Sequence, residues 1–162
     1  MSESSLLTFA EGLNKIACSM IEQDGEHVAM YFLAHGDGRV ESCLFEEENP
    51  SESVGPVRAR QLADAARASG ADAVVMVSEA WSAHRDDVPE GGRVRDTSGA
   101  QDILLLVGID RSGETVVLET PVFREPGGTT RVGETTTGND EWRVATLNGV
   151  RAVWGMPQHG PA

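Results

Sequence analysis

The residues best placed to do chemistry lie just after an apolar run in the middle of the sequence. Glu79, His84 and Asp86 follow that run closely. Carboxylates beside a histidine could act as a general acid–base pair, or their oxygens could hold a divalent cation. Arg93 and Arg95 lie a little further on, and guanidinium groups clamp anionic ligands. This stretch is therefore the candidate site if the chain is an enzyme or a small-ligand binder.

A structural explanation of the same stretch is favoured. The spacing of its acidic residues and histidine matches no recognised ligand motif. A long polar loop over residues 82–100, with Trp81 packed on the core, accounts for the composition. Loops of this length are often either functional or disordered, so the stretch stays the first place to look for a site.

Nucleophilic, metal and phosphate chemistry have weaker support. Neither thiol, Cys18 or Cys43, has sequence neighbours that predict an activated nucleophile, although Cys43 could approach His35 across a hairpin. The histidines lack zinc-site spacing. In the Gly-Asp-Gly stretch after His35, the dinucleotide fingerprint fails because Glu41 replaces its third glycine. We therefore predict no metal and no cofactor, and a catalytic role is disfavoured.

The charge balance narrows the class of partner. The 162 residues carry a formal net charge of −13, and Lys15 is the single lysine. Such a surface repels nucleic-acid phosphates and anionic lipids, which disfavours nucleic acid and membranes as partners. The acidity fits solubility, a salty cytoplasm, or a surface that docks a basic protein. In the last case the contact would include the acidic run Glu46, Glu47 and Glu48.

The location expected from the sequence is the cytoplasm. There is no 18-residue apolar stretch that would predict a transmembrane helix. Residues 1–5 lack the basic region of a secretory signal. Two cysteines make no disulfide framework, so both are expected to be reduced.

The apolar patterns predict two helices and five strands. Three- and four-residue spacing indicates a helix over residues 4–22, and a thinner stripe indicates another over 54–69. The expected strands are 27–33 and 39–45, joined by a glycine-rich turn, then 72–80, and finally a hairpin whose apolar runs are 103–107 and 115–118.

The last part of the chain has a different composition. Residues 125–140 are rich in turn formers, and Asn148-Gly149 is a two-residue hairpin signal. We predict a β-hairpin over 142–154 that brings Trp142 and Trp154 together, as a lid on the core or as an exposed aromatic patch at an interface. The domain organisation predicted is a core over 1–124, then a linker, this hairpin and a flexible tail over 125–162, packed on the same domain.

The predicted fold class is α+β: a mainly antiparallel sheet of about five strands with two packed helices, in the order α-β-β-α-β-β-β, plus the C-terminal hairpin. Over residues 4–123 this order resembles the roadblock/profilin-like architecture. The stretch Val77-Ser78-Glu79-Ala80-Trp81 resembles a strand end in uncharacterised bacterial domains. These resemblances imply a sheet with helices packed on it and carry no function, because unrelated functions share such layouts.

The function favoured by the sequence is that of a cytoplasmic domain that binds another protein or itself, without evident catalytic machinery. A homodimer could form through an edge strand or the helix layer. The alternative is an enzyme or a ligand or metal binder that uses the loop 79–95. A third possibility is a structural subunit of a larger assembly, in which the long loop and the tail become ordered.

Overall fold

The computed structural model describes residues 3–46, 54–82, 99–138 and 141–158. The helices are α1 (Glu3–Asp24), α2 (Val54–Ser69), α3 (Glu141–Ala145) and α4 (Asn148–Val153). The strands are β1 (Met30–Ala34), β2 (Val40–Leu44), β3 (Ala73–Ser82), β4 (Gln101–Asp110), β5 (Thr115–Arg124), β6 (Thr130–Val132) and β7 (Thr136–Thr137). The predicted α+β class and the element order up to β5 are confirmed.

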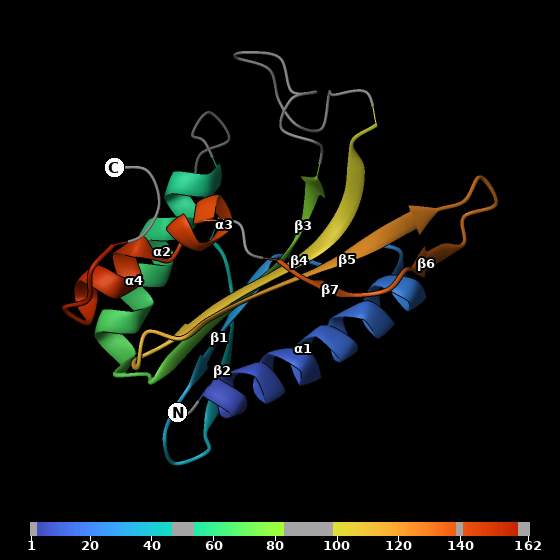
Figure 1. Cartoon of the computed structure of the whole chain (residues 1–162). Coiled ribbons are helices and arrows are strands. Elements are labelled where there is room, and N and C mark those ends of the chain that lie inside the picture. The colour runs from blue at the N-terminus through green and yellow to red at the C-terminus, as the bar shows by residue number, and fades with distance from the viewer. Residues whose placement is uncertain (1–2, 47–53, 83–98, 139–140, 159–162) are drawn as a thin grey trace.

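One antiparallel sheet organises the molecule. Its strand order is β2-β1-β3-β4-β5-β6, and the short β7 pairs with β5 (Figure 1). The central strands β3 and β4 are buried over most of their length because both of their faces are covered. The hairpins turn at Gly38 and Gly113, whose φ angles of +89° and +94° are easily adopted only by glycine. Among the described strands, β2 ends the sheet on one side.

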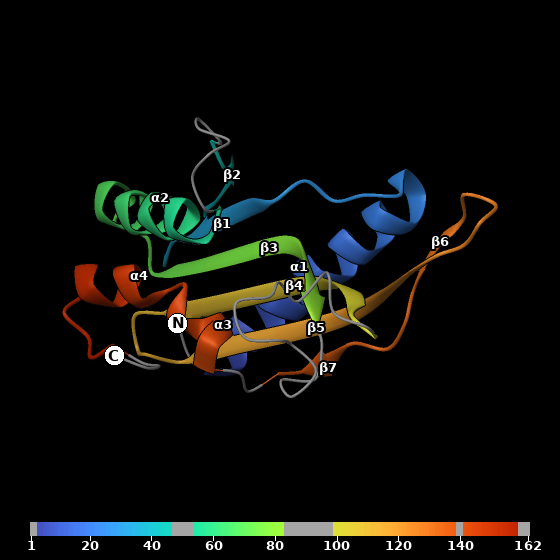
Figure 2. The ribbon, with the colours of Figure 1, turned by 90° about the horizontal axis from the view of Figure 1, so that it is seen from above.

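The sheet has a helix layer on each face. Helix α1 packs over β3, β4, β5 and β6, whereas α2 lies over the other face with α4 against it. Figure 2 shows α2 and α4 side by side at the end of the molecule far from β6. Alternation along β3 divides the core, since Val75 and Val77 join the α1 cluster while Val74 and Met76 join the α2 cluster.

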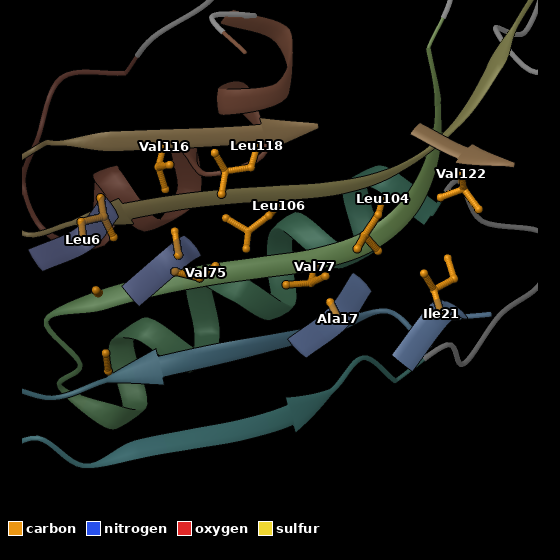
Figure 3. Close-up of a cluster of buried hydrophobic side chains, with 13 residues drawn as sticks. Leu6, Ala17, Ile21, Val75, Val77, Leu104, Leu106, Val116, Leu118 and Val122 are labelled. Atoms are coloured by element: carbon orange, nitrogen blue, oxygen red, sulfur yellow. The ribbon is translucent and has the colours of Figure 1, made fainter. Parts of the chain in front are cut away.

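The α1 cluster does not extend to the edge of the sheet. In Figure 3 the labelled side chains of α1 point toward those of β3, β4 and β5. The cluster also includes Ala34 of β1, and the half-buried Phe32 packs against it, whereas it includes no residue of β2. Within the described residues, the α1 cluster therefore reaches β1 and leaves β2 outside it.

The hairpin predicted over residues 142–154 is wrong, because the chain forms α3 and α4 there. Gly149 does not have the positive φ of a type I′ turn. Its lack of a side chain serves close helix packing instead: a Cβ at Gly149 would lie 2.9 Å from the Cβ of Ala63 in α2. Leu147 and Val150 are fully buried in the α2 cluster. The two tryptophans are therefore not paired across a hairpin.

Candidate functional site

Glu79, the first predicted catalytic residue, is held by a structural network. It forms an ion pair with Arg124 of β5, which also pairs with Asp102 of β4. The backbone N–H of His27 donates to Glu79 Oε2 at 3.2 Å, and Arg124 Nη2 donates to the Gly25 carbonyl at 2.9 Å. The cluster thus fastens the segment between α1 and β1 to the ends of three strands. The ion pair with Arg124 and the hydrogen bond from His27 give the Glu79 carboxylate a structural role.

His27 is the buried member of this network, and sequence reasoning did not single it out. Its side chain is 7% exposed, and its Nδ1 atom has no hydrogen-bond partner among the described residues. Burial lowers the pKa of His27 more than the Val28 backbone and the Glu79 carboxylate raise it. Glu79 accepts from the backbone N–H of His27 and is already paired with Arg124, so a neutral His27 imidazole and this carboxylate are not arranged as a general acid–base couple.

The remaining candidates of the long loop lie outside the described residues. These are His84, Asp86, Arg93 and Arg95. Within the described part of the chain, no group of three or more His, Cys, Asp or Glu side chains could hold a metal ion.

The acidic run and the tryptophans, proposed as partner contacts, are only partly described. Glu46 is fixed to α2 by its backbone, since its N–H donates to Gln61 Oε1 at 2.9 Å and its carbonyl accepts from the Gln61 amide. Glu47, Glu48 and the Trp142 side chain lie outside the described residues. Trp154 packs at the margin of the α2 cluster with the Arg111 guanidinium 5.2 Å from its ring centroid. This packing half-buries Trp154.

The thiols have no activating partner in the described structure. His35 does not turn toward Cys43, because its Nε2 atom lies 2.6 Å from Glu41 Oε2. Cys43 instead stands opposite Tyr31 in the β1–β2 ladder. Burial raises the pKa of Cys18, which keeps that thiol protonated.

A cleft of about 430 Å³ lies between α1 and the β5–β7 strands. At its base Asn14, 5% exposed, donates to the hydroxyls of Thr120 at 3.3 Å and Thr135 at 3.1 Å, and these hydroxyls are 2.7 Å apart. This cluster ties the chain before β7 to α1. Asn14 Oδ1 has no partner among the described residues, and the rim carries the opposite charges of Glu11 and Lys15. The hydrogen bonds among Asn14, Thr120 and Thr135 therefore satisfy most of the polar side-chain atoms at the base of the cleft.

A further surface feature is apolar. On the α1 side of the sheet, outside the α1 cluster, Val40, Ser42 and Leu44 of β2 lie on the same face as Phe32 of β1. There Val40 is 45% exposed and Leu44 is 63% exposed. Ile16 and Met20, one turn apart, are exposed on the flank of α1 opposite the Asn14 cleft. We call these side chains the open face; it comprises the exposed Ile16, Met20, Val40 and Leu44, together with the half-buried Met30 and Phe32, of which Phe32 also packs against the α1 cluster.

The open face adjoins the outer edge of β2, with which no other described strand pairs. The His35 N–H donates to the Arg39 carbonyl at 2.9 Å, which fixes the alternation of the β1–β2 ladder. Residues 41 and 43 therefore turn their backbone groups toward β1, while residues 40, 42 and 44 turn theirs outward. Strand β2 contains neither lysine nor proline, the residues that commonly protect sheet edges.

Comparison with known proteins places the chain in a phage family. A family model described as bacteriophage lambda protein ea47 matches residues 1–160. The chain belongs to this family. No curated protein and no solved structure matches it. The family description states no activity, and the comparisons lend no support to the roadblock/profilin resemblance. Among the described residues no helix combines the length and apolarity needed to cross a bilayer.

Proposed function

We propose that this member of the ea47 family is a protein-binding domain that works by self-association, with two copies joined at the β2 edge beside the open face. The observation that carries the proposal is that exposed apolar side chains lie on a strand whose outer edge has no partner strand among the described residues. Val40 and Leu44 expose about half of their surface or more, on the strand whose outer edge pairs with no other described strand. Exposed apolar surface beside a free edge is typical of an interaction site.

The charge of the chain supports a protein as the partner. A net charge of −13 repels nucleic acid and anionic lipid, whereas the open face is built from uncharged side chains. Glu41, the charged residue within β2, is paired with His35 of its own chain. The two free thiols suit a reducing cytoplasm, which is the location we propose.

A matched pair of variants tests the proposal by light scattering behind size exclusion. Val40→Asp places a charge on β2, and Phe123→Asp places one on β5 at a position of similar exposure, 44% against 45%. We expect wild type and Phe123→Asp to be dimers. Val40→Asp should dissociate about 30-fold more readily, because symmetry removes two apolar pairs of about 1 kcal/mol each.

The opposite pattern would contradict the proposal. If the wild-type chain stays monomeric at every concentration, it does not self-associate and the proposal is wrong. If Phe123→Asp disrupts the dimer and Val40→Asp leaves it intact, the two copies are joined near β5 and β6, at the end of the sheet opposite to β2.

A further inference from the structure

We infer that β2 pairs in antiparallel fashion with β2 of a second copy, with the two-fold axis passing through Ser42, so that two sheets become one continuous sheet. This inference rests on the proposed function and gives it a partner strand and a register. A two-fold axis perpendicular to a sheet makes identical edge strands antiparallel and keeps equivalent faces on the same side.

The backbone of β2 is complementary to itself in this register. Residues 40, 42 and 44 have outward amide and carbonyl groups, as the β1–β2 ladder requires. With the axis at Ser42, each Ser42 faces the Ser42 of the other copy, and each Val40 faces a Leu44. All of these positions are outward, so the two strands can exchange hydrogen bonds at every one of them without disturbing β1.

The side chains of β2 are complementary in the same register. The exposed Val40 of each copy meets the exposed Leu44 of the other, which forms two apolar pairs at the H-bonded positions. On the opposite face of the sheet, Glu41 meets the thiol Cys43. No like charges stand directly opposite each other within the five paired residues.

The neighbouring registers are poorer. An axis at residue 41 would place Glu41 opposite the Glu41 of the other copy, and like charges directly across a ladder are destabilising. An axis at residue 43 would place Leu44 opposite Ser42 and Val40 opposite Glu46, so that both apolar pairs are lost. The side chains therefore select Ser42 as the centre.

Joining the edges in this way also unites the two open faces. Because a perpendicular axis keeps both α1 helices on one side, Val40 and Leu44 of each copy lie between them. Ile16 and Met20 of α1 are exposed as well, and we expect them to face the same apolar band. The apolar side chains beside the edge are thereby buried against apolar side chains of the other copy, and this removal of apolar surface from water favours association.

Cysteine cross-linking reports the register directly. In the proposed pairing, residues 41 and 43 of different copies form a non-hydrogen-bonded pair, with Cα atoms about 4.5 Å apart, which suits a disulfide. Two Cys43 residues would be diagonal neighbours about 7–8 Å apart, beyond easy bridging. We would oxidise wild type, Glu41→Cys and Glu41→Cys/Cys43→Ser mildly, and compare them by non-reducing electrophoresis. Cys18 is present in all three.

We expect covalent dimers from Glu41→Cys, few from wild type, and few from Glu41→Cys/Cys43→Ser. Cross-linking of wild type through Cys43 would place the axis at residue 43 and overturn the register, and cross-linking of the double variant would place it at residue 41. If light scattering finds a dimer in which Glu41→Cys does not cross-link, edge pairing is wrong while self-association stands. A Glu41→Cys variant and a wild type that are both monomeric would overturn the proposed function as well.

Discussion

A chain with Ser42→Pro is expected to keep its fold and lose its dimer. Proline removes the Ser42 N–H, which points away from β1, so no hydrogen bond within the monomer is lost. In the dimer the same substitution removes two hydrogen bonds at the axis by symmetry. The ring also fills the space that the partner strand needs. We expect the dissociation constant to rise at least about 100-fold, which corresponds to about 2.7 kcal/mol.

The matched control is Ser42→Thr, which keeps the N–H and suits a strand. It should remain dimeric, and both variants should have the circular dichroism spectrum of the wild type. Sedimentation velocity at several concentrations measures the association. If Ser42→Pro is as dimeric as Ser42→Thr, the outer edge of β2 is not the contact.

Leu147→Ala is expected to cause the largest loss of stability among simple truncations in the C-terminal segment. Leu147 is 0% exposed where α3 meets α4, and it belongs to the α2 cluster. Truncation leaves a cavity that the sheet and α2 cannot easily fill. We expect the free energy of unfolding to fall by about 2–4 kcal/mol.

Leu7→Ala provides the comparison, since Leu7 lies on α1 and is 39% exposed. Its cost should be under about 1 kcal/mol. Urea unfolding of both variants at one protein concentration measures the difference. Equal costs for the two leucines would show that α3 and α4 do not pack on the core as described.

The central strands were predictable, and the C-terminal helices were not. The apolar runs of β3, β4 and β5 are buried on both faces, and such short continuous runs between turn signals predict buried strands. At the C-terminus two patterns overlap. The Asn148-Gly149 pair favours a hairpin, while the apolar residues Val144, Leu147, Val150 and Val153 have three-residue helical spacing. The close packing of Gly149 against Ala63 of α2 favours the helices, and this contact between distant parts of the chain cannot be seen in the sequence.

The site was predictable only in part, for the same reason. The position of Glu79 near a strand end made it a candidate, but its partners are 52 and 45 residues away in the chain, at His27 and Arg124. The alternation of β2 correctly placed Val40, Ser42 and Leu44 on one face. That this face adjoins a free edge depends on the strand order and on the placement of α1, and neither is encoded locally.

Sedimentation equilibrium of the wild-type chain, in low and high salt, tests self-association through the open face most directly. Each copy carries a net charge of −13, and the proposed contact is apolar with backbone hydrogen bonds. Salt screens the repulsion between copies, so the dimer should tighten between about 0.05 M and about 0.5 M ionic strength. A chain that is monomeric at every ionic strength, or a dimer that dissociates as salt is added, would contradict self-association through the open face.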